Sequence, residues 1–154
     1  MAYSVFLSHS STDSKWVRWI KDNAQNAGIA VYLYEHDPQP GKLIAHKVRT
    51  AIQQCDALVV LLTASGQSSA YVQQEVGAAK MANKLIIPLV QPGINANLAM
   101  LQGIEYIPFD FAHPQEALKR LLPHLQKLKQ TKENQQAILL GLASLILLGL
   151  LSSK

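Results

Sequence analysis

The sequence has one cysteine, no charged-then-apolar secretion signal at its start and no close pair of metal-ligating side chains. Cys55 is the only cysteine in 154 residues, which excludes a disulfide within the chain. The soluble part is therefore expected in a reducing cytosol. The five histidines are scattered, and no His, Cys or carboxylate residues have the spacing of metal ligands, so we expect no bound metal.

The first 112 residues also lack net charge, because eight Lys and Arg side chains balance eight Asp and Glu side chains. The positive excess of the whole chain comes from six later residues, which lie beside a long apolar run. Nucleic-acid binding needs a concentrated basic surface, so we expect a membrane surface as the partner and no nucleic acid. The six basic residues are Lys119, Arg120, Lys127, Lys129, Lys132 and Lys154.

Five short runs rich in β-branched and aromatic residues occur in the first 110 positions, and they predict five strands. Between them, apolar residues recur at helical spacing, as in Trp16, Ile20 and Ala24. Strands alternating with amphipathic helices favour a parallel sheet covered on both faces. The prediction is an α/β, flavodoxin-like three-layer fold with a five-stranded parallel sheet. The predicted strands are residues 3–7, 29–34, 57–62, 85–90 and 104–109.

The chain after the fifth predicted strand divides into three parts. A leucine stripe from Leu118 to Leu128 predicts a closing helix, so the domain is expected to cover residues 1–128. Residues 129–136 are polar and predict either a linker or an exposed helical extension. The connection at 92–102 carries little pattern, so the fourth helix is expected to be short or irregular.

Residues 137–153 form a hydrophobic helix in this prediction. From 137 to 151 every residue is apolar except Ser144. Fifteen residues reach roughly 22 Å, against a hydrocarbon core of about 30 Å, so the span is short. Lysines on its N-terminal side follow the positive-inside pattern and favour a tail that anchors a cytosolic domain to the inner (cytoplasmic) membrane. The alternative is a helix that packs against its copies in a soluble oligomer.

The candidate ligand site lies where the predicted first and third strands end. In an open parallel sheet the ligand crevice forms at the carboxyl ends of the strands, at the point where their order reverses. The first strand leads into small hydroxyl residues at 8–13, and the third leads through 63–69 into a helix that contains Glu75. On that helix Glu75 lies about 60° from the centre of the apolar face, near the crevice. Each feature also has an interpretation without a ligand. In these alternatives Ser10 to Asp13 only cap a helix, His9 is a hydrogen-bonded structural residue and Glu75 is exposed to solvent.

Other α/β families lack their signatures here. No G-x-G-x-x-G follows the first strand and no G-x-x-x-x-G-K-[ST] occurs, which argues against dinucleotide-binding Rossmann and P-loop proteins. A response-regulator receiver needs acidic residues after the first strand and an Asp at the end of the third. This chain has Ser8, His9 and Thr63 at those places.

Four ordered motifs resemble the TIR (Toll/interleukin-1 receptor) family. Residues 5–10 (VFLSHS) resemble its first-strand motif, and residues 34–41 (YEHDPQPG) its second strand and BB loop. Residues 55–62 (CDALVVLL) are similar to its third strand, and residues 69–75 (SAYVQQE) to the segment that carries the catalytic glutamate in NAD-cleaving members. Residues 86–89 also fit. The resemblance covers nearly all of residues 4–90.

For enzymatic members, the resemblance implies cleavage of the nicotinamide–ribose bond of NAD⁺, which is the substrate, with no cofactor. Nicotinamide leaves as a neutral molecule, so one carboxylate is enough. Glu75 would be catalytic, and the position four before it, often Trp in bacterial members, is Tyr71 here. The residues that this resemblance assigns to substrate binding are Phe6, Ser8, His9, Ser69 and Tyr71. Those it assigns to the BB loop and assembly are Asp37, Pro40 and Gly41.

Three functions follow as hypotheses. The first is a TIR NAD⁺ glycohydrolase or cyclase that depletes NAD⁺ or makes an ADP-ribose-type signal in bacterial antiphage defence, activated by self-association through TIR–TIR contacts. The second is a non-catalytic, membrane-anchored TIR adaptor, for which a carboxylate at Glu75 is not needed. The third is a transferase of related topology that processes free nucleosides.

Overall fold

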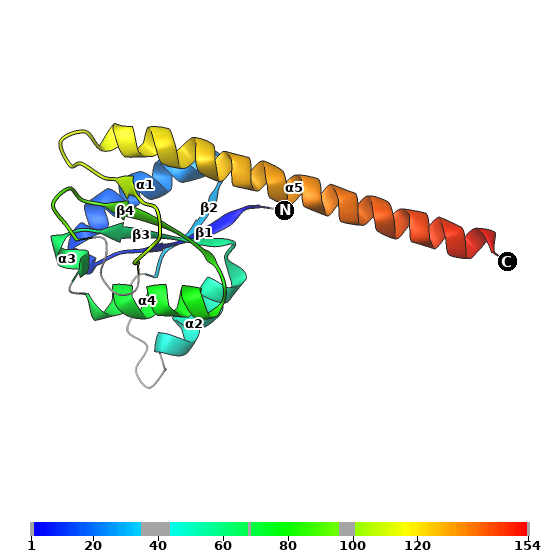
Figure 1. Ribbon diagram of the computed structural model, residues 1–154, viewed down its shortest axis with the longest axis horizontal. Helices are drawn as coiled ribbons and strands as arrows, with labels where there is room; N and C mark the ends of the chain where they lie inside the picture. The colour runs from blue at the N-terminus through cyan, green and yellow to red at the C-terminus, as the bar shows by residue number, and fades with distance from the viewer. Residues whose placement is uncertain (1, 35–43, 68, 96–100, 154) are drawn as a thin grey trace.

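A five-stranded, all-parallel sheet forms the centre of the computed structural model (Figure 1), which describes residues 2–34, 44–67, 69–95 and 101–153. The strand order is β2-β1-β3-β4-β5, which is the flavodoxin-like order. The predicted fold class is therefore confirmed. The strands are β1 (Ser4–Ser8), β2 (Ala30–Tyr32), β3 (Ala57–Leu62), β4 (Leu85–Val90) and β5 (Ile107–Pro108).

The strands differ in length according to their place in the sheet. β3 lies at the centre and all six of its residues are buried, as expected for an apolar strand covered on both faces. β2 and β5 lie at the edges, where each has only one neighbour, and they have three and two residues. Both strands are shorter than the apolar runs at 29–34 and 104–109 from which they were predicted. A run of apolar residues indicates that a segment is buried, but it does not show how many of its residues pair with a neighbouring strand.

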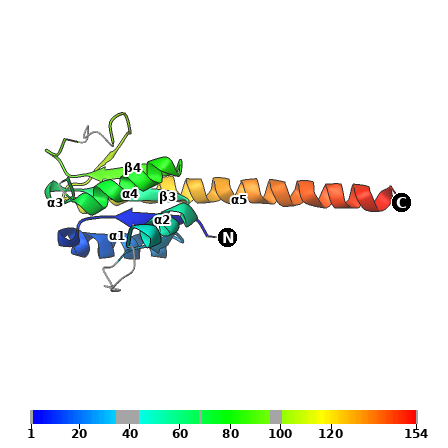
Figure 2. The ribbon, with the colours of Figure 1, turned by 90° about the horizontal axis from the view of Figure 1, so that it is seen from below.

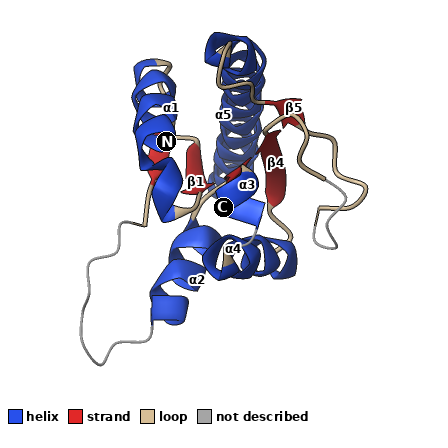
Figure 3. Cartoon of the chain, turned by 90° about the vertical axis from the view of Figure 1, so that its left-hand side faces the viewer, coloured by secondary structure: helices blue, strands red, loops and turns tan. Residues whose placement is uncertain are grey.

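In the described part of the chain, two helices cover each face of the sheet (Figure 3). α1 (Ser14–Asn26) and α5 (Pro114–Ser152) cover one face, and α2 (Ile44–Gln54) and α4 (Ala70–Met81) cover the other. Alternation along β1 serves both layers: Leu7 packs with the α1 and α5 core, while Phe6 packs with the α2 and α4 core. Two short elements, η1 (Ser11–Asp13) and α3 (Ala64–Gln67), follow β1 and β3.

α5 is one continuous helix of 39 residues that projects far beyond the domain (Figure 2). Its first part buries Leu118, Leu121 and Leu125 against the sheet, as the leucine stripe predicts. Residues 129–136 belong to this helix. The apolar part beyond them is exposed, and by length and composition this helix is able to cross a membrane.

Polar contacts tie α5 to the edge of the sheet where the strands begin. Gln126 Nε2 donates to the Ala27 carbonyl at 3.5 Å. Lys132 Nζ donates to Asp56 Oδ2 at 2.9 Å and to the Ala2 carbonyl at 3.0 Å. Asp56 Oδ2 also accepts from the Ser4 backbone N–H at 2.8 Å. The helix is therefore held to the domain as far as Lys132, within the segment for which a linker was one prediction.

The connection between β4 and β5 is turn-rich where it is described. Turns occupy residues 92–94 and 101–103, and residues 96–100 lie outside the described part. The prediction of a short or irregular fourth helix therefore falls partly outside the described residues.

Candidate functional site

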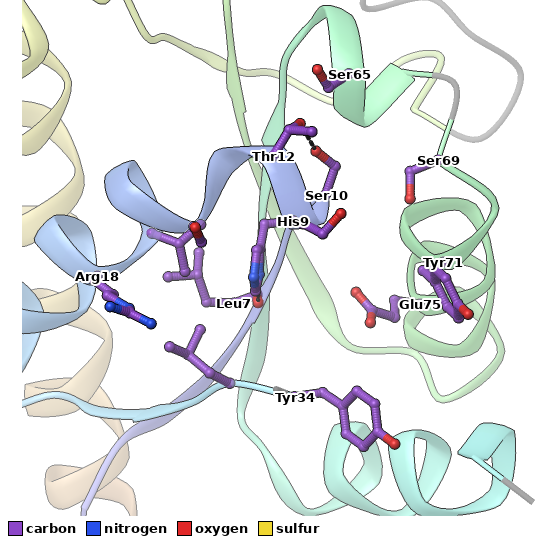
Figure 4. A pocket seen from close by; sticks show the side chains of 14 residues that line it. Leu7, His9, Ser10, Thr12, Arg18, Tyr34, Ser65, Ser69, Tyr71 and Glu75 are labelled. Carbon is purple, nitrogen blue, oxygen red and sulfur yellow. Dashed lines mark hydrogen bonds between the residues drawn. The ribbon is translucent and has the colours of Figure 1, made fainter. Parts of the chain in front are cut away.

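A cavity of about 600 Å³ opens at the carboxyl edge of the sheet, between the ends of β1 and β3 (Figure 4). This is the place predicted from the reversal of strand order. Side chains from β1, η1, α1, α3 and α4 reach it, together with the end of β2. Its lining is Leu7, His9, Ser10, Ser11, Thr12, Ser14, Val17, Arg18, Leu33, Tyr34, Ser65, Ser69, Tyr71 and Glu75.

Glu75 is a buried carboxylic acid in the wall of this cavity. It lies on α4, with 7% of its surface exposed, and it shares the buried side of the helix with Val72 and Val76. Ser8 Oγ donates a hydrogen bond to Glu75 Oε2, and the Ser8 side chain is fully buried at the end of β1. The strand end thus holds one carboxyl oxygen in a fixed place. The alternative in which Glu75 is exposed to solvent is therefore wrong.

Burial also sets the protonation of this acid. Removal from water raises the pKa of the Glu75 carboxyl to about 7, and the hydrogen bond from Ser8 acts in the opposite direction. The group therefore exchanges between acid and carboxylate near neutral pH. A strongly raised pKa beside a cavity is a frequent property of catalytic carboxyl groups.

A second buried carboxylate, Asp13, joins the two strand ends beside the cavity. Asp13 Oδ2 accepts from Thr63 Oγ1 at 2.6 Å and from Ser10 Oγ at 3.2 Å. Ser10 Oγ and Thr12 Oγ1 lie 2.7 Å apart. Thr63 follows β3, whereas the other three residues follow β1. The hydroxyl-rich turn therefore joins the two sides of the crevice, and neither Ser10 nor Asp13 makes a side-chain hydrogen bond that caps a helix.

The start of α4 places an aromatic ring next to the carboxylate. Ser69 is the N-cap, and its Oγ accepts from the Val72 N–H at 3.4 Å. Tyr71 lies one turn before Glu75, is 47% exposed and lines the cavity beside the carboxyl group (Figure 4). Tyr71, Glu75 and Tyr34 also line a second cavity of about 620 Å³ between α2 and α4.

The predicted site residues fall into three groups. His9, Ser69, Tyr71 and Glu75 line the cavity together. Phe6 and Ser8 lie below its surface, because both point into the layer between the sheet and α4; the Phe6 ring packs 5.4 Å from that of Tyr32. The predicted BB-loop residues lie outside the described part of the chain; they are Asp37, Pro40 and Gly41.

The lining residue Arg18 had no sequence signal, and it reaches the cavity from the second turn of α1. Ser65 reaches the cavity from α3, and it belongs to the run at 63–69 that was predicted to lie at the crevice. Tyr34 also lines the cavity, because the end of the second strand lies at the same edge of the sheet as the ends of its neighbours. In the described part of the chain no three His, Cys, Asp or Glu residues are grouped to hold a metal ion.

One family model matches most of the chain. A family model described as a TIR domain matches residues 5–122. A Brachypodium distachyon protein named "Probable 2' cyclic ADP-D-ribose synthase BdTIR" is 26% identical over 123 residues, which is 76% of this chain and 55% of that protein. The chain therefore spans about half the length of this curated relative.

Solved structures show the same fold. The TIR domains of the activated Roq1 resistosome are 14% identical, with a TM-score of 0.64, over 80% of this chain and 99% of that one. A CMP N-glycosidase from Clostridium botulinum, BcmB, is 22% identical, with a TM-score of 0.53, over 81% of this chain and 97% of the other.

Proposed function

The chain belongs to the TIR domain family, and from that premise we propose that it is an enzyme that cleaves the nicotinamide–ribose bond of NAD⁺. The buried Glu75 at the cavity wall carries this proposal. Among the described residues that line the cavity, Glu75 has the only carboxyl group. A reaction that needs one carboxylate fits this site better than one that needs two.

The reaction has this requirement because of its leaving group. Nicotinamide departs from a cationic ground state as a neutral molecule, so no general acid has to protonate it, unlike the leaving oxygen in ordinary glycoside hydrolysis. Positive charge grows on the ribose as the C–N bond breaks. The Glu75 carboxylate holds the ribose hydroxyls and stabilises that oxocarbenium charge, and its low-dielectric surroundings strengthen the effect.

The rest of the cavity positions the substrate in this proposal. Tyr71 stacks on a ring of NAD⁺, and His9 and Ser69 line the space beside it. Ser8 fixes the orientation of the carboxyl group from below. NAD⁺ is the substrate and no cofactor takes part. Water attacks the ribose carbon and loses a proton to give ADP-ribose, or a hydroxyl group of the same molecule attacks that carbon and loses a proton to give a cyclic isomer. The similarity to a protein named as a cyclic ADP-ribose synthase supports the latter.

The C-terminal helix determines the location of the enzyme in this proposal. We propose that residues 137–153 anchor the domain to the cytoplasmic membrane, where clustering raises local concentration and promotes TIR–TIR contacts that activate the enzyme. Ser144 is the only polar side chain within 137–151, and its Oγ donates to the Leu140 carbonyl at 2.9 Å, which leaves no unpaired hydroxyl to face lipid. Antiphage defence is the biological role that we propose for such an enzyme.

Nicotinamide release from NAD⁺ by the full chain in liposomes tests this function. We expect release by the wild type that rises faster than linearly with protein density, and loss of at least about two orders of magnitude in Glu75→Gln. Glu105→Gln, the same change at an exposed glutamate, is the matched control and is expected to keep full activity. CMP serves as an alternative substrate. No release from clustered wild-type protein would favour the non-catalytic adaptor, and release of cytosine alone would favour a nucleotide glycosidase.

A further inference from the structure

The turn between α4 and β4 lies on the same side of the domain as the start of the tail. In a parallel sheet the amino ends of the strands share one edge, and this turn leads into the amino end of β4 at Leu85. α5 leaves the domain at that edge, where Lys132 contacts Asp56 and the Ala2 carbonyl. Figures 1 and 2 both show the tail running out on the side where the N-terminus lies.

The turn is held rigidly and exposes basic and apolar side chains together. The Lys84 N–H donates to the Ala79 carbonyl at 2.9 Å and the Asn83 N–H to the Lys80 carbonyl at 3.1 Å, with Asn83 at a φ of 54°. This pair of hydrogen bonds is a Schellman motif. On its outer side Met81 is 89% exposed and Leu85 is 44% exposed.

In the part of the chain that the structure describes, the α4–β4 turn adds two unpaired positive charges to this edge. Lys80 is exposed, Lys84 is partly exposed, and neither has an ion-pair partner among the described residues. The carboxylate of Asp56, at the same edge, is neutralised by Lys132. Exposed lysines beside apolar side chains match a surface that presents anionic headgroups over hydrocarbon.

The length of the helix brings this edge close to a bilayer. Ala137, where the apolar segment begins, lies five positions after Lys132, which is about 7.5 Å along the helix. The headgroup layer on one side of a bilayer is roughly 5–8 Å thick. The edge therefore lies within about one Debye length of the headgroups, and the usual helix tilt of about 20° brings one side of it closer.

From these observations we propose that the α4–β4 turn is a second membrane contact, which binds anionic lipid headgroups through Lys80 and Lys84 while the tail is inserted. The inference rests on the membrane anchoring proposed above and adds a defined orientation. The carboxyl edge, with the crevice, then faces away from the bilayer. The lipid composition of the membrane then affects the orientation in which the domain is held.

Lysine acetylation of the full chain tests this contact. The protein is reconstituted in neutral phosphatidylcholine vesicles, in vesicles with added phosphatidylglycerol, and in neutral detergent, and the modified lysines are quantified by mass spectrometry. We expect Lys80 and Lys84 to react at least about threefold more slowly on anionic vesicles than in detergent, with the protection lost at high salt. Lys15, at the opposite end of the domain on the first turn of α1, is the internal control and is expected to react equally in all three.

Vesicle flotation separates the two proposals. If the chain floats with both vesicles but Lys80 and Lys84 react as in detergent, the tail inserts and the second contact is wrong. Equal protection on neutral and anionic vesicles would assign the turn to a contact with another copy of the chain, and would also overturn the inference. If the chain floats with neither vesicle, the anchoring fails and this inference fails with it.

Discussion

Glu75 and Ser8 meet beneath the crevice in a part of the domain that excludes water. Burial raises the pKa of Glu75 from 4.5 in the unfolded state to about 7 in the folded state. Between pH 4.5 and pH 7 the carboxyl group is therefore protonated in the folded state and ionised in the unfolded state. Folding stability contributed by this group therefore falls as the pH rises from 4.5 to 7, and stays low above that. The penalty is roughly 3 kcal/mol, at about 1.36 kcal/mol per pKa unit.

Glu75→Gln is expected to stabilise the domain at pH 8 by up to about 3 kcal/mol and to leave its stability unchanged at pH 4, because the amide keeps the shape without the buried charge. Urea unfolding at both pH values measures the difference. Glu105→Gln, at an exposed position, is expected to change the free energy of unfolding by less than about 0.5 kcal/mol at either pH. Equal stability of Glu75→Gln and wild type at pH 8 would show that the native carboxylate is not desolvated.

Activity is expected to depend on the same proton with the opposite sign. The proposed chemistry needs the carboxylate, so kcat/KM for NAD⁺ should rise with pH and level off above an apparent pKa near 7. Ser8→Ala removes a hydrogen bond that lowers the pKa of Glu75, so the midpoint should move to higher pH. Gln53→Ala, an exposed change on α2, is the control and should leave the profile in place. A midpoint unmoved by Ser8→Ala contradicts the assignment.

Strands inside the sheet could be predicted from the sequence, whereas contacts between distant elements could not. The runs at 57–62 and 85–90 coincide with β3 and β4 because these strands lie inside the sheet, where burial and pairing coincide. Helical periodicity predicted that Glu75 lies at the edge of a buried face. Its hydrogen bond to Ser8 was not predictable, because it joins residues 67 positions apart and depends on how α4 packs on β1. The cavity residue Arg18 likewise follows from packing alone.

Asp13 links two elements, so its removal is expected to affect both stability and the crevice. Asp13→Ala leaves the buried hydroxyl of Thr63 without this acceptor, and the expected loss is about 1–3 kcal/mol in the free energy of unfolding. Thr12→Ala, an exposed neighbour that contacts only the rim of this network, is the control and should cost less than about 1 kcal/mol. Denaturant unfolding of the two variants decides between a linking role and a simple cap, for which both losses would be similar.

The whole molecule combines a packed domain with a long helix that the domain does not cover. Deletion of residues 137–154 keeps Lys132 and its contacts, and it removes only exposed side chains among the described residues. We expect the midpoint of thermal unfolding to stay unchanged, flotation with vesicles to be lost, and NAD⁺ cleavage at low protein concentration to fall by at least about tenfold, with recovery at high concentration. Unchanged activity at low concentration would show that the tail is not needed for clustering.

The uninterrupted α5 helix has a geometric consequence for assembly. In the anchored state that we propose, copies held by this continuous helix share one direction, so their crevices all face away from the membrane before any two copies meet. Two copies that meet then need only the correct lateral position and the correct rotation about the membrane normal, because their orientation relative to the membrane is already fixed. A flexible linker of equal length would provide the same proximity without this alignment.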